Sequence, residues 1–245
     1  MRMQKKLKVA LIGYGKMGKA VEQMLRSRQH AITAIIDHED EWAGKREKLA
    51  ESDVAIEFTM PEAAPDNIMR CFELDVPVVT GSTGWLDKMP AIVNYCKEHN
   101  RTLFHASNFS IGVNIFFELN TRLAGMLAEA TGYKPSITET HHTQKLDAPS
   151  GTAITLAKEI ISRRDNLGKW GNADEQLPED VLPIKSHRIE NVTGTHAVTY
   201  DSMIDCIEIK HTAHNRSGFA EGAVLAAEWV HDKQGVFGMK DLLNI

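Results

Sequence analysis

Cysteine is scarce in this chain, and the few that occur are scattered. Cys71, Cys96 and Cys206 are odd in number and form no Cys-x-x-Cys pair, so neither a disulfide framework nor a cysteine-rich metal site is expected. No apolar run reaches the roughly 18 residues that a membrane-spanning helix needs. The basic N-terminus leads into a short apolar run and then a glycine-rich loop, with no cleavage site. We therefore expect a reduced, cytoplasmic protein with no membrane partner.

Positive charge is also in short supply. The chain carries 28 lysines and arginines against 33 acidic residues, a formal net charge of −5. Such a chain has no general basic field, so no nucleic-acid partner is expected. An acidic small molecule would need a local basic site, because the chain as a whole repels it weakly. The length of 245 residues predicts one or two domains.

A glycine-rich loop stands between a predicted strand and a predicted helix. Residues 7–12 predict a buried strand, residues 19–26 predict a helix, and Gly-Tyr-Gly-Lys-Met-Gly lies between them. In a dinucleotide-binding fingerprint the three glycines permit a tight turn, close approach of the pyrophosphate, and close packing of helix on strand. A glycine-rich turn without a ligand is the alternative. The predicted cofactor contacts are Gly13, Tyr14, Gly15, Lys16, Met17 and Gly18.

An acidic residue follows the second predicted strand. Residues 31–36 predict that strand, and Asp37 ends it about twenty residues past the glycines. A carboxylate at this place accepts hydrogen bonds from the adenine ribose and repels a 2′-phosphate, which favours NADH over NADPH. A strand-end or helix-cap role is the alternative. Four basic side chains could still partner such a phosphate: Lys16, His38, Lys45 and Arg46.

Strands and helices continue to alternate through the first half of the chain. Strands are predicted at 53–59, 76–80 and 102–106, with helices from about 61 and from 87 to 99. This alternation predicts a parallel, doubly wound α/β sheet of the Rossmann type. Ligands of such sheets bind outside the carboxyl ends of the strands. Residues 81–84 and 105–110 are therefore candidates for nicotinamide contacts, with simple turn chemistry as the alternative.

The second half has a different character and predicts an α+β substrate domain. The expected helices are 111–130, 153–163 and 219–231, with a short helix in the tail 235–245. The expected strands are 136–140, 184–189, 195–202 and 203–211, with a turn at 200–202, and residues 164–182 are expected to form a loop.

Residues 139–153, Glu-Thr-His-His-Thr-Gln-Lys-Leu-Asp-Ala-Pro-Ser-Gly-Thr-Ala, concentrate proton and anion chemistry. Histidine titrates near neutral pH and suits general acid catalysis. Lys145 offers a positive charge, and the N–H groups of Gly151 and Thr152 at a helix start suit an anion. The stretch predicts a dicarboxylate site beside a proton donor, although a helix cap and a solvated lysine are the alternatives. No metal site is expected, because neither His-Glu-x-x-His nor a third clustered ligand occurs.

Five motifs taken together resemble 4-hydroxy-tetrahydrodipicolinate reductase (dihydrodipicolinate reductase) of lysine and diaminopimelate biosynthesis. They are residues 13–18, Phe-Thr-Met-Pro-Glu at 58–62, Gly-Ser-Thr-Gly at 81–84, Ser-Asn-Phe-Ser-Ile-Gly-Val-Asn at 107–114, and residues 139–153. The resemblance runs in order along nearly the whole chain. Ser82 stands where threonine is commoner, and Asp37-His38 lacks the arginine that follows the acidic residue in some members.

The resemblance implies roles for individual residues. His141 would be the proton donor and Lys145 its partner, while His142, Gly151 and Thr152 would hold the substrate carboxylates. Hydride would pass from NADH or NADPH to a substrate ring that has lost water. The nicotinamide would be lined by Gly81, Ser82, Thr83, His105, Ala106, Ser107, Asn108 and Phe109.

The resemblance also implies a discontinuous dinucleotide-binding domain, residues 1–108 and 217–245. Residues 109–216 would form a substrate domain whose open mixed sheet builds a homotetramer. Two other functions are compatible with such an architecture: a different NAD-linked amino-acid dehydrogenase, and a non-catalytic dinucleotide-binding protein. Neither would be expected to keep the whole run from His141 to Ala153.

Overall fold

The chain forms two compact units in the computed structural model, which describes residues 5–129, 132–215 and 217–245. One unit comprises residues 1–111 and 217–245, and the other comprises residues 112–216. The first boundary lies at Ile111 rather than at the expected residue 108, because Ile111 packs against the hydrophobic core of the first unit.

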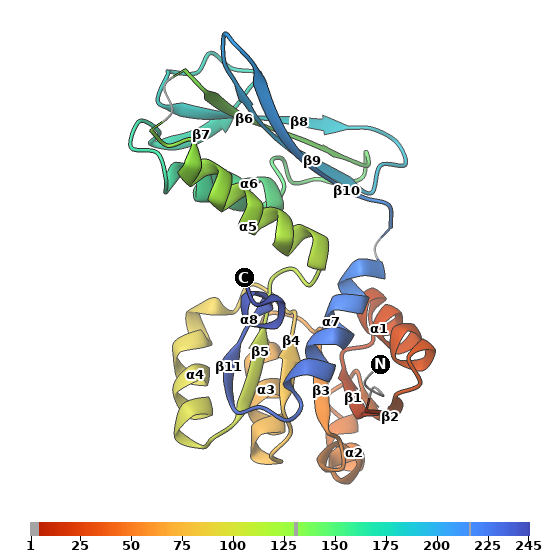
Figure 1. Cartoon of the computed structure of the whole chain (residues 1–245). Helices are drawn as coiled ribbons and strands as arrows, with labels where there is room; N and C mark the ends of the chain where they lie inside the picture. Colours follow the sequence, from red (N-terminus) through yellow and green to blue (C-terminus); the bar gives the residue numbers. More distant parts are fainter. Residues whose placement is uncertain (1–4, 130–131, 216) are drawn as a thin grey trace. The chain divides into compact units, whose positions relative to one another are not determined.

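The first unit is built on a six-stranded sheet in the order β11-β5-β4-β3-β1-β2, and all its strand pairs are parallel (Figure 1). This arrangement confirms the predicted doubly wound sheet. The strands are β1 (Lys8–Ile12), β2 (Ala31–Ile36), β3 (Val54–Glu57), β4 (Val78–Thr80), β5 (Thr102–His105) and β11 (Gly235–Phe237). The helices are α1 (Lys16–Ser27), α2 (Glu41–Ala50), α3 (Ala64–Glu73), the 3₁₀ turn η1 (Leu86–Lys88), α4 (Met89–Glu98), α7 (Ser217–Val230) and α8 (Met239–Leu243).

Helices cover both faces of this sheet. Side chains alternate between the faces along a strand, and β1 shows the result. Val9 and Leu11 pack into a core shared with α1 and α7, whereas Ala10 and Ile12 pack into a core shared with α2, α3 and α4. The central strands are therefore apolar on both sides and read as continuous apolar runs in the sequence.

The second unit is built on a five-stranded mixed sheet in the order β10-β9-β6-β8-β7. β7, β8 and β6 run parallel, and β9 is antiparallel to both β6 and β10. Helices α5 and α6 pack their apolar side chains against one face of the sheet. The elements are α5 (Ile111–Met126), β6 (Lys134–His141), α6 (Gly151–Ile161), β7 (Lys169–Asn172), β8 (Val181–Arg188), β9 (Gly194–Asp201) and β10 (Cys206–Ala213).

Three elements differ from the sequence-based expectations. The segment 164–182 is not a continuous loop, because residues 169–172 add β7 to the sheet edge. The tail pairs with β5 through β11 before it forms α8. Helix α2 was not predicted at all. Only Leu49 of α2 is buried, and β7 and β11 are very short, so none of the three carries an apolar repeat.

The β9–β10 hairpin turns later than predicted. Buried Tyr200 pairs with Ile207, which extends β9 to Asp201. The turn is closed by the N–H of Ser202, which donates to the carbonyl of Asp205 at 3.0 Å. Helix α5 ends at Met126, and residue 130 of the expected helix lies outside the described residues.

The glycine loop gives a matched test of packing. A Cβ on Gly18 would lie 2.2 Å from the carbonyl oxygen of Gly13, whereas a Cβ on Gly15 would meet nothing within 4 Å. We expect Gly18→Ala to lower the free energy of unfolding by about 2–3 kcal/mol and Gly15→Ala, at a helix N-cap, to lower it by only about 0.5–1 kcal/mol. Urea denaturation of the ligand-free proteins measures both, and equal losses would contradict this account of the turn.

Candidate active site

The predicted cofactor segments of the first unit all follow carboxyl ends of parallel strands. Backbone hydrogen bonds between neighbouring strands continue past those ends. The N–H of Phe58 donates to the carbonyl oxygen of Ile12 at 2.8 Å, and the N–H of Gly81 donates to the carbonyl oxygen of Glu57 at 3.0 Å. Because the strands are parallel, the loops after β1, β3, β4 and β5 lie along one edge of the sheet (Figure 1). This is the edge at which ligands of doubly wound sheets bind.

The glycine loop fits a pyrophosphate. Gly13 has φ +88°, and a Cβ there would lie 2.1 Å from the carbonyl oxygen of Phe58. Gly15 is the N-cap of α1 and faces open space. No side chain caps α1, and the first turn of α1 carries no acidic residue. The first N–H groups of a helix have no partner within it, so they suit a phosphate. Exposed Lys16 opens the helix, while Met17 and Tyr14 are partly buried beside it.

Asp37 holds the glycine loop to the end of β2. Its Oδ1 accepts the N–H of Tyr14 at 2.7 Å, and its side chain is 40% exposed. Glu41 accepts the N–H groups of Asp37 and His38, at 2.6 and 3.0 Å, and pairs with Lys45. Bonds from Lys45 and then from these backbone groups lower the pKa of Glu41 to about 2. Lys45 is therefore committed to Glu41, which leaves one fewer partner for a 2′-phosphate.

A buried carboxylate joins two of the cofactor loops. Glu57, the last residue of β3, is fully buried and accepts hydrogen bonds from the hydroxyls of Thr59, Thr80 and Ser82. Thr59 N–H also donates to Glu57, at 2.9 Å. The loops after β3 and β4 are thereby fixed to one charged group. The Ser82 hydroxyl faces this carboxylate, and Trp85 donates to the Ser82 carbonyl at 2.9 Å.

The loop after β5 divides into core and surface residues. Ala106 and Phe109 are buried in the core of the first unit, and Phe109 stacks on Phe104 with centroids 5.9 Å apart. These two can offer only backbone groups to a ligand. Burial lowers the pKa of His105, which lies edge-on to Trp85. Ser107 and Thr83 are exposed, and Asn108 accepts the N–H of Ser110 at 2.9 Å.

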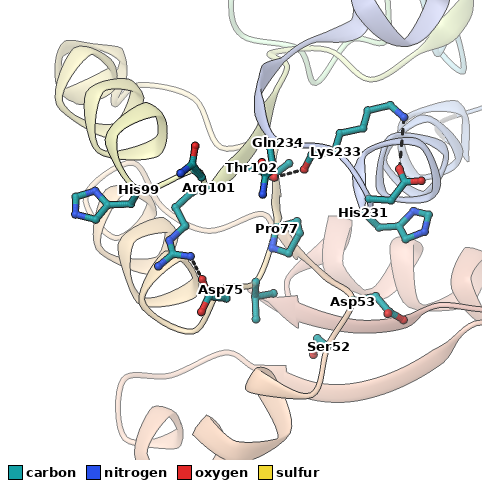
Figure 2. A pocket seen from close by; sticks show the side chains of 13 residues that line it. Ser52, Asp53, Asp75, Pro77, His99, Arg101, Thr102, His231, Lys233 and Gln234 are labelled. Carbon is teal, nitrogen blue, oxygen red and sulfur yellow. Dashed lines mark hydrogen bonds and ion pairs between the residues drawn. The ribbon is translucent and has the colours of Figure 1, made fainter.

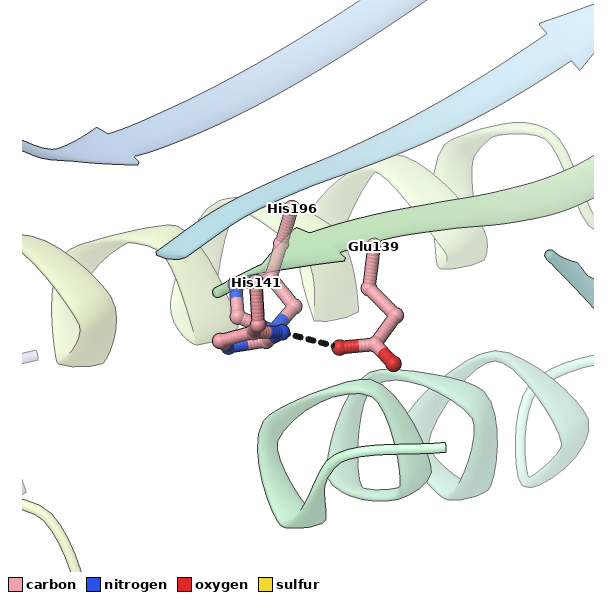
Figure 3. A group of neighbouring side chains, drawn as sticks. All are labelled: Glu139, His141 and His196. Atoms are coloured by element: carbon pink, nitrogen blue, oxygen red, sulfur yellow. Dashed lines mark ion pairs between the residues drawn. The ribbon is translucent and has the colours of Figure 1, made fainter. Parts of the chain in front are cut away.

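Three polar side chains gather at the end of the core of the second unit (Figure 3). Along β6, Ile137, Glu139 and His141 share the buried face. Glu139 is fully buried and forms an ion pair with Nδ1 of His141. The ring of His196, from β9, lies edge-on to His141 with centroids 5.0 Å apart. Arg188, at the end of β8, donates to the other Glu139 oxygen at 3.0 Å.

Ser150 connects this cluster to the start of α6. Its hydroxyl lies 3.0 Å from Nε2 of His196, and it also accepts the N–H of Ala153 at 3.2 Å as the N-cap. Gly151 and Thr152 follow at the first two helical positions, where backbone N–H groups have no partner within the helix. The structure thus brings the predicted anion groups next to the predicted proton donor.

Lys145 and Asp147 form a bidentate ion pair, with both Nζ–O distances at 2.8 Å. This pair lowers the pKa of Asp147. Arg188 donates to the carbonyl oxygens of Lys145 and Asp147, at 3.2 and 2.6 Å. The loop is therefore anchored to the residue that also neutralises Glu139. His142 follows directly after β6 and is half-buried.

The charges of the cluster are set by burial and pairing. Burial opposes ionisation of Glu139, yet hydrogen bonds from His141, Ser186 and Arg188 outweigh it and hold the pKa at about 2. Burial first, and then the charge of His141, lower the pKa of His196 to about 4. At neutral pH the cluster therefore holds an anionic Glu139 and an uncharged His196.

Glu139, His141 and His196 offer ligand atoms within 4.8 Å of one another, a spacing that a metal ion could use. Each group nevertheless has a protein partner: Glu139 binds His141 and Arg188, and His196 binds Ser150. We therefore interpret the cluster as a network of ion pairs and hydrogen bonds.

Sequence reasoning missed the roles of His196, Arg188 and Glu57. The alternation from Ile137 through Glu139 to His141 was a usable signal, because it places both polar residues on the apolar face. Glu57 likewise ends the apolar strand Val-Ala-Ile-Glu. His196 and Arg188 lie about 50 residues from the motif, and only strand pairing brings them to it.

A separate hollow lies at the opposite edge of the first sheet (Figure 2). Its lining includes Asp53, Asp75 and Arg101, which precede β3, β4 and β5 at their amino ends. Arg101 is ion-paired with Asp75, and Nζ of Lys233 lies 3.4 Å from Oδ1 of Asp232. The hollow is therefore remote from the ligand edge of this fold, and its cations are already matched by carboxylates.

The doubly wound sheet and these groups indicate an oxidoreductase that uses a dinucleotide cofactor. Comparison with known families is specific. Residues 7–109 match the model "Dihydrodipicolinate reductase, N-terminus", and residues 112–243 match "Dihydrodipicolinate reductase, C-terminus". The chain belongs to the dihydrodipicolinate reductase family, which confirms the resemblance seen in its motifs.

Individual relatives agree with this assignment. The chain is 50% identical over 238 residues to 4-hydroxy-tetrahydrodipicolinate reductase of Christiangramia forsetii, covering 97% of this chain and 98% of the relative. It is 36% identical to the Neisseria meningitidis serogroup C protein of the same name, over 80% of this chain and 74% of that one. A dipicolinate-bound dihydrodipicolinate reductase from Paenisporosarcina sp. TG-14 shares the fold, with a TM-score of 0.76 at 24% identity over 96% and 98% of the chains. In the described part of the chain, no helix is both long and apolar enough to cross a membrane.

His196 predicts a pH-dependent stability. Its folded-state pKa of about 4 lies below the ordinary 6.5, so the unfolded chain takes up the proton first as the pH falls. The stabilisation is complete above pH 6.5 and is lost between pH 6.5 and 4, by up to about 3 kcal/mol. Urea titrations of the wild type and His196→Gln measure this, and we expect a flatter profile for the variant. Parallel profiles would show that His196 is not buried as a neutral ring.

Proposed function

We propose that the protein reduces 4-hydroxy-tetrahydrodipicolinate to tetrahydrodipicolinate, with NADH or NADPH as the reductant, in the diaminopimelate route to lysine. The observation that carries this is the link from Glu139 through His141 and His196 to Ser150, which sets an ion-paired imidazole beside a helix N-terminus. Such a site suits a substrate that bears carboxylates and needs a proton.

The second unit would bind the two carboxylates of the substrate. The N–H groups of Gly151 and Thr152, with the Thr152 hydroxyl, suit one carboxylate. Lys145 and His142 are the proposed partners of the other. Because Lys145 is paired with Asp147 in this structure, a substrate carboxylate would replace Asp147 as its partner. Arg188 holds the carbonyl groups of this loop, so the exchange needs only side-chain movement.

His141 would supply the proton. Loss of water leaves a conjugated imine, and a bound dinucleotide supplies hydride to the ring. The electron density left after hydride addition must take up a proton, and the imidazolium of His141 donates it. Glu139 stabilises that imidazolium through Nδ1, and the neutral His196 adds no competing positive charge. No nucleophilic residue is needed, because the cofactor carries the hydride chemistry.

The first unit would hold the dinucleotide, with NADH preferred. The glycine loop and the start of α1 suit the pyrophosphate. Asp37 lies where the adenine ribose would bind, and its charge opposes a 2′-phosphate. Glu41 keeps Lys45 occupied, while Lys16 and His38 are exposed. Residues of the loops 81–83 and 105–109 are the proposed nicotinamide contacts, through backbone groups at Ala106 and Phe109.

The alternatives named from the sequence explain less of the site. A non-catalytic dinucleotide-binding protein has no use for a carboxylate buried against an imidazole. A different amino-acid dehydrogenase would not need the hydrogen bond between His196 and Ser150, the N-cap of α6. The homotetramer implied by the family resemblance remains part of the proposal. The exposed Met203 and Ile204 at the β9–β10 turn are consistent with burial in an assembly.

A coupled assay tests the proposed reaction. With the product of dihydrodipicolinate synthase as substrate, we expect oxidation of NADH by the wild type. His141→Ala should lower kcat by roughly 10²-fold or more, because general acid catalysis is lost. His99→Ala is the matched control, since His99 is exposed beyond α4 in the first unit. Full activity of His141→Ala would refute its role, and no turnover with either cofactor would refute the reaction.

Cofactor preference is tested at Asp37. We expect Asp37→Ser to lower the ratio of kcat/KM for NADH to that for NADPH by about tenfold, equivalent to about 1.4 kcal/mol. The loss of the charge removes repulsion of the 2′-phosphate and a hydrogen-bond acceptor for the ribose. Asp40→Ser provides a control because Asp40 is an exposed carboxylate three positions further on. An unchanged ratio would place the ribose away from Asp37.

A further inference from the structure

Glu139 is a carboxylate that binds no substrate group and transfers no proton in the proposed reaction. It is fully buried under α6, although burying a charge is costly unless it is paired. Its two ion-pair partners are on different oxygens: Nδ1 of His141 on one and the guanidinium of Arg188 on the other. The carboxylate therefore binds both the ring of His141 and Arg188, which anchors the loop that carries Lys145.

The Nε2 edge of the His141 ring lies beside Gly194. A Cβ on Gly194 would lie 3.1 Å from Nε2 and 3.2 Å from Cδ2 of His141. Gly194 begins β9, so the ring packs directly beside a backbone position that has no side chain. With Nδ1 bound to Glu139, the nitrogen left to exchange a proton with a substrate is Nε2.

Titratable and charged groups from three strands and one loop lie around His141. Glu139 comes from its own strand, His196 from β9, and Arg188 reaches the same carboxylate from β8. Lys145, from the loop after β6, and His211, from β10, both act on His196. Glu139 is the anion of this group that contacts the ring, through Nδ1.

We propose that Glu139 is the positioning residue of the reaction: it binds Nδ1 of His141, so that Nε2 presents the transferred proton, while Arg188 moderates the influence of its charge. This inference rests on the proposed function of His141. It assigns Nε2 of His141 as the nitrogen that gives up the proton, Glu139 as the group that orients the ring, and Arg188 as the charge that opposes Glu139. A positioning role of this kind predicts changes in kcat and in its pH dependence, with little change in substrate affinity.

Two variants should shift the pH profile in opposite directions. A general acid must be protonated, so activity falls on the alkaline side. Glu139→Gln removes the charge that favours the imidazolium, and we expect this alkaline limb to move to lower pH by about one unit, with kcat reduced about tenfold or more. Arg188→Gln removes the opposing charge, so the limb should move to higher pH. Glu190→Gln, an exposed carboxylate beyond β8, should leave the profile unchanged.

Other readouts separate positioning from simple stabilisation. We expect KM for the dicarboxylate to change less than about threefold in Glu139→Gln. In ¹⁵N-histidine-labelled protein, a downfield Nδ1 proton assigned by its absence from His141→Asn should shift upfield in Glu139→Gln. This spectrum needs no turnover, so it distinguishes the inference from the proposed reaction.

The outcomes are distinct. An unmoved alkaline limb in both Glu139→Gln and Arg188→Gln, or an unchanged Nδ1 signal in folded Glu139→Gln, would overturn the inference while leaving the reaction intact. Should Glu139→Gln fail to fold, Arg188→Gln alone decides: a shift to higher pH supports the inference, and a shift to lower pH or none overturns it. Full activity of His141→Ala would instead remove the function on which the inference rests.

Discussion

Burial of carboxylates at the ends of strands is the constraint on which both halves of the proposed chemistry depend. Removing a carboxylate from water is costly unless charged or polar partners replace the solvent. Glu139 meets this requirement with a histidine, an arginine and a serine, and Glu57 meets it with three hydroxyls and a backbone N–H. In each unit these partners include a residue of the proposed site, Ser82 for Glu57 and His141 for Glu139, so satisfying the buried charge also fixes groups that would bind a ligand.

The two buried carboxylates organise different kinds of site. Glu57 ties the loops after β3 and β4 together, and these loops are proposed cofactor contacts. Glu139 acts through side chains, because His141 and Arg188 are respectively the proposed acid and the anchor of the Lys145 loop. The N-cap Ser150 extends this second network to the start of α6 through His196. The proposed proton donor and the proposed anion-binding groups are thus joined by short-range contacts from α6, the ends of β6 and β8, and the start of β9.

The sequence predicts the fold well wherever apolar periodicity and glycine geometry decide the outcome. The strand before Gly13 and the helix after it follow from such signals, as does the parallel sheet. The strands β7 and β11 are not predicted from the sequence, because each is too short to show a repeating apolar pattern. At the site, the motif around His141 indicates which chemistry to expect. It does not indicate that His196 and Arg188 complete it, because their positions are set by the pairing of β9 and β8 with β6. Sequence spacing also leaves open which nitrogen of His141 has a partner, since that depends on the direction in which Glu139 points.

The central claim is that the protein delivers a hydride from the dinucleotide to the ring of a dicarboxylate. Isotope transfer tests this most directly. NADH bearing deuterium at the transferred position of C4 is oxidised in the presence of the dihydrodipicolinate synthase product, and the product is measured by mass spectrometry. The account predicts a tetrahydrodipicolinate heavier by one deuterium than the product formed with unlabelled NADH. A product without cofactor-derived deuterium, under conditions in which labelled NADH is consumed, would contradict it.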